Sequence, residues 1–180
     1  MIVVIVGKTA SGKTTVLNEL VKKGYEQIIT YTTRPPRKGE KQKKTYNFIT
    51  EEEFKEKIQD GFFAEYEYFD TAEGRWYYGS AISDYTDGKI VILTPTGLSK
   101  IKQSYDTFSI YLYSNHSTIL KRLKQRKDNK QEAERRIKSD DLDFKEVENQ
   151  VDKIVYNNSG SEVDDVVNRI MEVVKCQKNR

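Results

Sequence analysis

Residues 7–14 read GKTASGKT, and the segments on either side of this stretch decide the fold. The preceding run, Ile2–Val6, is apolar and β-branched, which is typical of a buried parallel strand. The following run places Val16, Leu17, Leu20 and Val21 on one helical face, and Gly24 is suited to end that helix. A strand, a glycine-containing loop and a helix in this order predict a phosphate-binding loop.

This loop predicts a site for a nucleoside triphosphate. Its backbone N–H groups are expected to point at phosphate oxygens, and the helix that follows adds the positive end of its dipole. Lys13 is expected to reach the β- and γ-phosphates, and Thr14 to offer its hydroxyl to a magnesium ion. A bare turn between a strand and a helix needs neither side chain, which argues against that simpler interpretation.

The composition indicates one soluble domain with a heavily charged surface. The chain has 180 residues, and its 31 basic and 28 acidic residues leave a net charge of +3, too even to argue for a nucleic-acid partner. The single cysteine, Cys176, can form no intramolecular disulfide, which fits a cytoplasmic location. The short apolar N-terminus lacks a basic leader, so neither a signal peptide nor a membrane span is expected. The lone His116 has no partner at metal spacing and is expected to be exposed.

Alternation of apolar strands with helices predicts a parallel α/β sheet. Further strands are expected at 26–30, 89–93, 107–113 and 152–156. Helices are expected from 94 to about 105, from about 115 to 150 with a break near Asp128–Asn129, and from 161 to 174. The last helix should bury one stripe of side chains: Val163, Val166, Val167, Ile170 and Val174.

An insert at about 31–85 interrupts the alternation. Residues 31–47 are polar and carry two prolines, so a long loop is expected. Thr50 and Glu53 predict a capping box at a helix start, with Gly61 as the end. Two antiparallel strands are expected at 62–69 and 75–80, and their aromatic residues should form most of a small core: Phe62, Phe63, Tyr66, Tyr68, Phe69 and Trp76.

Several motifs in sequence order resemble the guanylate kinase family over nearly the whole chain. They read TTRPPRKGE at 32–40, YNF at 46–48, Glu65 followed by YYGS at 77–80, LKRLKQR at 120–126, RRI at 135–137 and IVYN at 154–157. The resemblance implies a P-loop kinase core at 1–30 and 86–180, with parallel β-sheet flanked by helices. It also implies an inserted small mixed α/β GMP-binding lobe at 31–85 and a helical lid at about 122–138.

The resemblance also implies a role for each matching residue. ATP would contact the phosphate-binding loop together with Arg122 and Asn157, the loop residues being Gly7, Lys8, Thr9, Ala10, Ser11, Gly12, Lys13, Thr14 and Thr15. Forked guanidinium groups suit a dianionic phosphate, and Arg34, Arg37, Tyr46 and Tyr78 would clamp that of GMP. One carboxylate can meet both the N1–H and the 2-amino group of guanine. The resemblance assigns this role to Glu65, with further contacts from Thr30, Ser80 and Thr96. Catalysis would rest on Lys13, Arg34, Arg126 and Arg136, with Arg122 and Arg135 as further lid candidates.

One segment departs from the family pattern. The family usually has D-x-D where this chain has Thr94-Pro95-Thr96, so two carboxylates, one near the metal and one at the guanosine, are expected to be missing. The expected reaction is ATP plus GMP (or dGMP) to ADP plus GDP, with Mg²⁺ and ATP as cofactors. Nucleotides would be the partners of a cytoplasmic monomer or weak homodimer. Two alternatives stay open: a related kinase with another acceptor, and a binding module with little turnover, against which the complete loop argues.

Overall fold

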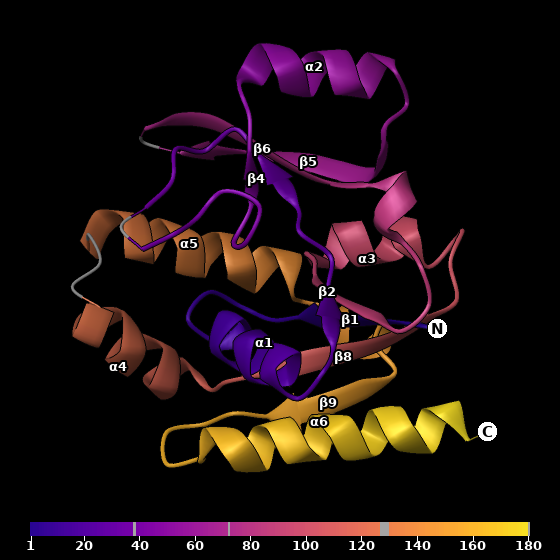
Figure 1. Cartoon of the computed structure of the whole chain (residues 1–180). Coiled ribbons are helices and arrows are strands. Elements are labelled where there is room, and N and C mark those ends of the chain that lie inside the picture. Colours follow the sequence, from indigo (N-terminus) through magenta and orange to yellow (C-terminus); the bar gives the residue numbers. More distant parts are fainter. Residues whose placement is uncertain (38, 72, 127–129, 180) are drawn as a thin grey trace.

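The computed structural model describes residues 1–37, 39–71, 73–126 and 130–179, and it shows two sheets with a helical layer between them (Figure 1). The larger sheet is wholly parallel, in the order β2-β7-β1-β8-β9. Its strands are β1 (Ile2–Val6), β2 (Glu26–Gln27), β7 (Lys89–Ile92), β8 (Thr107–Tyr113) and β9 (Lys153–Tyr156). Because β1 is central, the loop that follows it lies at the middle of the carboxyl edge, where open α/β sheets bind ligands.

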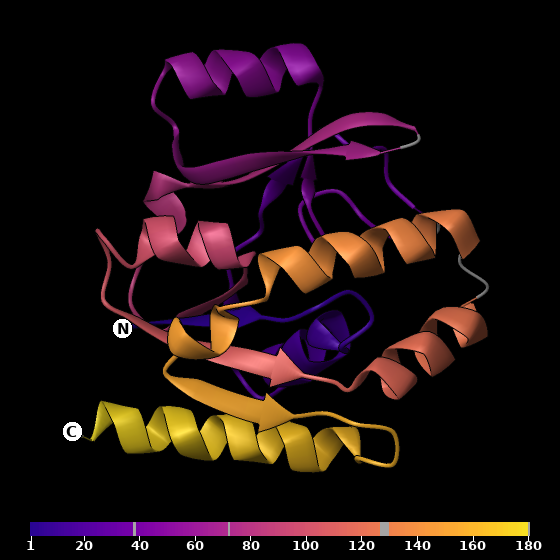
Figure 2. The ribbon, with the colours of Figure 1, turned by 180° about the vertical axis from the view of Figure 1, so that it is seen from behind.

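Helices cover both faces of this sheet, as the apolar composition of β1 predicts. On one face, Ile5 packs in a buried cluster with α1 (Lys13–Lys22) and α6 (Val163–Lys178). On the other, Val4 packs with α3 (Pro95–Ile101) and with residues that follow α5 (Lys130–Asp143). Figure 2 shows α5 running between the two sheets, with α4 (His116–Arg126) beside it. Short 3₁₀ turns lie at Ile82–Asp84 and Val147–Asn149, and Val147 of the second is buried in the core.

The smaller sheet is built from the inserted segment. Its order is β4-β3-β6-β5, with β3 (Tyr31–Thr32), β4 (Asn47–Phe48), β5 (Phe63–Thr71) and β6 (Gly74–Ala81). The long pair β5–β6 is antiparallel, as predicted. Helix α2 (Glu51–Gln59) begins with the predicted Thr50–Glu53 capping box and covers the outer face of this sheet, where Phe54 stacks on Phe63 at 4.4 Å between ring centroids (Figure 1).

Several element boundaries differ from the prediction. The strand expected at 26–30 ends at Gln27, and the chain crosses to the smaller sheet, so the expected loop 31–47 contains β3 and the start of β4. The helix expected at 115–150 is two helices that end at Asp143, and the predicted break near Asp128–Asn129 lies outside the described residues. Helix α3 ends at Ile101, and α6 begins at Val163 and continues to Lys178.

Two predictions about burial are wrong in part. Val163 is 37% exposed because it begins α6, whereas the other four members of its stripe are buried. Tyr66 and Tyr68 are 39% and 53% exposed, because the lobe is too thin to bury every aromatic side chain of β5. His116 and Cys176 are exposed, in line with the prediction for the histidine. None of the described helices has the length and apolar character needed to cross a membrane.

Candidate active site

A cleft of about 1080 Å³ lies between the carboxyl edge of the parallel sheet, the inner face of the smaller sheet and α5. The loop 7–14 contributes its floor through Gly7, Thr9, Lys13 and Thr14. The smaller sheet contributes carboxylates and aromatic rings, and α5 contributes both arginines and aspartates. The sequence motifs that were far apart along the chain therefore open into one space.

Glycine is required where the loop enters α1. Gly12 is the N-cap residue of α1 at φ 97°, a left-handed conformation that favours glycine. A Cβ atom there would also lie 2.5 Å from Nδ2 of Asn157. Among the described residues no side chain caps α1, which leaves the first N–H groups of this helix suited to bind an anion.

The Lys13 ammonium is folded back into the loop. It donates to the carbonyl oxygens of Gly7 and Lys8, the latter at 2.8 Å. The pKa of Lys13 is lowered to about 8, chiefly because burial desolvates the ammonium. The negative charge of Asp140 opposes this shift, and the positive charge of Arg126 adds to it. Thr14, the predicted magnesium ligand, is exposed beside Lys13 and lines the same cleft.

Two aspartates of α5 contact the loop, and no motif in the sequence predicts these contacts. An Asp140 carboxylate oxygen accepts a hydrogen bond from the Thr9 N–H, and Asp141 forms an ion pair with Lys8. Burial raises the pKa of Asp140, although the Thr9 hydrogen bond and the charge of Lys13 oppose that shift. In this conformation the Asp140 carboxylate therefore accepts the hydrogen bond from the Thr9 N–H that a phosphate oxygen would otherwise accept.

Arg122 and Asn157 lie beneath the loop. Arg122 Nη1 donates to the carbonyl oxygens of Ala10 and Ser11 at 3.2 and 3.0 Å, and its Nη2 donates to Asn157 Oδ1 at 3.2 Å. The buried Asn157 donates from Nδ2 to Ser11 at 2.8 Å. Both side chains thus hold the loop's shape, and their contact with ATP stays a prediction.

The predicted phosphate clamp lies at the other side of the cleft. Arg34 is 6% exposed and forms a bidentate pair with Glu40 at 2.9 and 3.0 Å. Its guanidinium carbon also lies 5.4 Å from the centre of the Tyr46 ring, and Tyr46 packs edge-on against Tyr78. Arg37 is exposed, and its backbone N–H donates to Glu40 at 2.7 Å. Glu40 therefore orients the Arg34 side chain and the Arg37 backbone, a role that was not predicted from the sequence.

Glu65 lies at the deep end of the same wall. It is 7% exposed and accepts a hydrogen bond from the Ser80 hydroxyl, which also contacts the Tyr85 hydroxyl at 2.7 Å. Burial raises the pKa of Glu65 to about 7, with a smaller contribution from the charge of Glu67 and an opposing one from the Ser80 hydrogen bond. A buried carboxylate with so few partners is suited to accept hydrogen bonds from a ligand. Thr30 also lines the cleft.

The lid arginines occupy different environments. Arg135 and Arg136 of α5 line the cleft, and both donate to Glu132 at 2.8 Å. Arg126 is the exposed last residue of α4, and the middle of the predicted lid, 127–129, lies outside the described residues.

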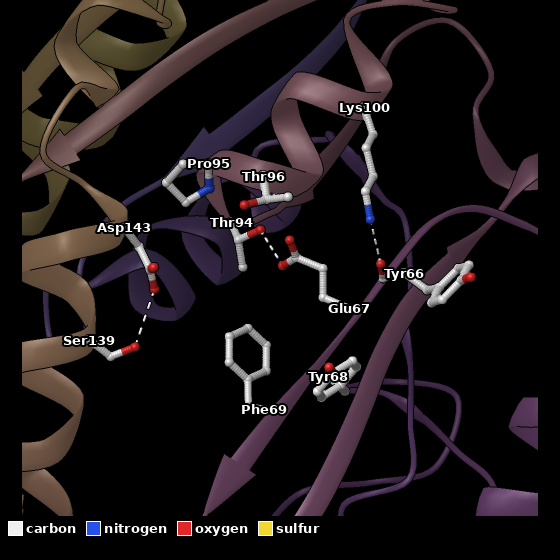
Figure 3. A pocket seen from close by; sticks show the side chains of 10 residues that line it. All are labelled: Tyr66, Glu67, Tyr68, Phe69, Thr94, Pro95, Thr96, Lys100, Ser139 and Asp143. Atoms are coloured by element: carbon white, nitrogen blue, oxygen red, sulfur yellow. Dashed lines mark hydrogen bonds between the residues drawn. The ribbon is translucent and has the colours of Figure 1, made fainter.

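Thr94 and Thr96 bring no acid of their own to the end of β7, but a carboxylate reaches Thr94 from another strand. Glu67 of β5 lies within hydrogen-bonding distance of the Thr94 hydroxyl (Figure 3). Thr96 is exposed on the first turn of α3 and lines a smaller pocket of about 480 Å³ beside it. In the described part of the chain, no three His, Cys, Asp or Glu residues gather as a metal-binding cluster.

Comparisons with known proteins agree with this architecture. A family model described as guanylate kinase matches residues 1–177. The chain is 32% identical to a guanylate kinase of Prochlorococcus marinus subsp. pastoris, covering 97% of this chain and 96% of the relative, and 32% identical to one of Clostridium tetani, covering 100% and 88%. A crystal structure of guanylate kinase from Anaplasma phagocytophilum shares the fold with a TM-score of 0.73 at 21% identity, covering 100% of this chain and 87% of the other.

Proposed function

The chain belongs to the guanylate kinase family, and we propose that its cleft transfers the γ-phosphoryl group of ATP to GMP or dGMP. One observation carries the proposal: the phosphate-binding loop, the oriented Arg34 and the buried Glu65 line a single cleft. A donor site and an acceptor site that share a cleft can place two phosphates in line, and phosphoryl transfer depends mainly on such positioning and on charge stabilisation. No covalent intermediate is needed.

The donor side binds ATP through the loop 7–14. Lys13 leaves its carbonyl partners for the β- and γ-phosphates, which restore the hydrogen bonds that it gives up. The Thr14 hydroxyl is a hard oxygen donor open to the cleft, which suits a magnesium ion that keeps most of its waters and needs few protein ligands. Bound there with ATP, the ion would offset phosphate charge. Arg122 and Asn157 keep the loop in shape, and Asn157 is expected to contact adenine.

The acceptor side binds the monophosphate at its two ends. Arg34 and Arg37, with the hydroxyls of Tyr46 and Tyr78, hold the phosphate. At the base end, ionised Glu65 accepts from guanine N1–H and the 2-amino group, which adenine does not offer, and Ser80, Thr30 and Thr96 supply further polar contacts. Arg126 and Arg136 converge on the transferring group when the lid closes, stabilise its charge and exclude water.

A coupled ADP-release assay tests the function. We expect the protein to turn over GMP and dGMP with ATP and Mg²⁺, and to turn over AMP, CMP, UMP and dTMP poorly. Preference for another acceptor would favour the related-kinase alternative, and binding of GMP without turnover would favour the binding-module alternative. The same preparation, passed over a sizing column, tests the expected monomer or weak homodimer. The lobe boundaries 31–85 and the cytoplasmic location belong to the same proposal.

A further inference from the structure

The Glu67 carboxylate is held in a fixed orientation by Thr94. The Thr94 hydroxyl caps α3 by accepting a hydrogen bond from the Gly97 N–H at 2.9 Å, and it donates its own proton to Glu67 Oε2 (Figure 3). A threonine hydroxyl has only one proton to donate, so this arrangement commits it to Glu67. The other carboxylate oxygen of Glu67 stays available for a ligand.

Strand register places Glu67 on the wall that faces the cleft. In the β5–β6 pair, Glu65 lies opposite Ser80 and Glu67 opposite Tyr78. Directly opposed residues of antiparallel strands share a face, and so do residues two apart on one strand. Glu65, Glu67 and Tyr78 indeed all line the large cleft.

The position of Glu67 along this wall identifies the part of the acceptor that it meets. Two residues of a strand span roughly 7 Å, so Glu67 lies about that far from Glu65. Glu65 is the proposed reader of the base, and Tyr78, opposite Glu67, belongs to the proposed phosphate clamp. The group of a nucleotide that lies between its base and its phosphate is the ribose.

The chemistry of Glu67 suits ribose hydroxyls. No lysine or arginine of the described ranges forms an ion pair with it, and Thr94 is the hydrogen-bond partner that the structure shows there. Glu67 is half-buried, and its charge is close enough to Glu65 to oppose ionisation of that residue. An ionised carboxylate that is partly removed from water is stabilised by hydrogen-bond donors, and a ribose offers its 2′- and 3′-hydroxyls as donors.

We propose that Glu67, positioned by Thr94, determines sugar specificity by accepting a hydrogen bond from the ribose 2′-hydroxyl of the acceptor nucleotide. This inference rests on the proposed function, in which the acceptor is GMP or dGMP. It implies that the ribonucleotide is the better acceptor, since dGMP lacks the 2′-hydroxyl.

Steady-state kinetics of Glu67→Gln with GMP and dGMP, at saturating ATP and Mg²⁺, test this role. Wild-type kcat/KM should be about tenfold higher for GMP than for dGMP, as expected for loss of one hydrogen bond to a charged group. Glu67→Gln should lower kcat/KM for GMP about tenfold, mainly through KM, and that for dGMP less than threefold. The KM for ATP should not change. Thr94→Val should also lower kcat/KM for GMP. Thr94→Ser keeps the hydroxyl and should therefore keep the wild-type ratio of kcat/KM for GMP to that for dGMP.

Asp70→Asn is the matched control. Like Glu67→Gln, this substitution removes one negative charge from β5. Asp70 is exposed, however, and it is paired with Arg75 at 2.7 Å. This variant should keep the wild-type preference for GMP.

Three results would overturn the inference: no change in Glu67→Gln, an equal loss for GMP and dGMP, or a raised magnesium requirement at unchanged GMP KM. The last result would assign the carboxylate to the metal instead. A wild-type protein that turns over neither nucleotide would overturn the proposed function itself, whereas an active wild type with an unselective Glu67 would overturn this inference alone.

Discussion

Replacing Glu65 with glutamine should stabilise the unliganded protein at neutral pH. Burial raises the pKa of Glu65 from an ordinary value of 4.5 to about 7. At 1.36 kcal/mol per pH unit, ionising this buried carboxyl costs the folded state roughly 3 kcal/mol. A glutamine keeps the carbonyl oxygen that accepts from Ser80 and has no charge to bury.

The sign of the pH dependence follows from which state holds the proton. Between pH 4.5 and 7 the unfolded chain ionises Glu65 while the folded protein keeps it protonated. Stability contributed by this group is therefore full below pH 4.5, falls as pH rises and is constant above pH 7. The difference in unfolding free energy between Glu65→Gln and wild type should be near zero at pH 4.5 and about 3 kcal/mol at pH 8.

Folding favours the protonated form of Glu65, whereas GMP binding should favour its ionised form. The ionised Glu65 is the form that accepts from guanine, so wild-type affinity should fall about tenfold between pH 8 and pH 6. Glu65→Gln should bind GMP more weakly at pH 8 and lack this part of the pH dependence. The ionisation of the GMP phosphate near pH 6 affects both proteins alike, so the difference between them isolates the carboxyl.

Urea unfolding and calorimetric GMP titration at pH 4.5, 6, 7 and 8 measure both effects. The reasoning is refuted if the stability difference does not change over this range, or if wild type and Glu65→Gln lose GMP affinity in parallel. Unchanged ATP affinity in the variant confirms that the donor side is intact.

Three further substitutions probe the rest of the cleft. Lys13→Ala should lower kcat by orders of magnitude and leave calorimetric GMP binding unchanged, because Lys13 belongs to the donor side; near wild-type turnover would contradict this. Arg34→Ala should raise the GMP KM at least tenfold and lower the unfolding free energy by about 1–3 kcal/mol, because Glu40 loses its buried ion-pair partner. Arg37 is exposed, so Arg37→Ala should raise the GMP KM without lowering stability. Equal losses of stability in the two variants would contradict this distinction. Asp140→Asn should tighten magnesium-free ATP binding severalfold by removing a negative charge from the Thr9 N–H, and weaker binding would show that Asp140 serves the nucleotide instead.

Local patterns carried most of the correct predictions about the fold. The loop 7–14, the capping box at Thr50 and the apolar strands β1 and β8 depend on residues close in sequence. The two-residue strands β3 and β4 depend on hydrogen bonds to distant segments. Each is only two residues long, and the segment that joins them is polar and contains two prolines, so no periodicity marks them. The division of 115–150 into two helices was expected, but the end of α5 at Asp143 was not.

The candidate site was predictable where a motif carried it. The structure places most of the predicted cleft residues along one space, among them Lys13, Arg34, Tyr78 and Glu65. Glu40 lies in the loop between β3 and β4, and its pairing with Arg34 was not predicted. Glu67 and Asp140 were missed as contributors because a glutamate on a strand or an aspartate on a helix is usually solvent-facing. Only the packing of β5 against α3, and of α5 against the loop, brings these carboxylates to the cleft.

The Thr94 position shows why a missing acid in a motif is poor evidence for a missing charge. Thr94 holds the carboxylate of Glu67, so negative charge reaches the end of β7 from β5. The substitution Thr94→Asp would keep a cap for α3 but set a second carboxylate beside the first, where like charges repel. Thr94 and Glu67 therefore depend on each other, and the charge of such a site has to be counted over the cleft that a ligand meets.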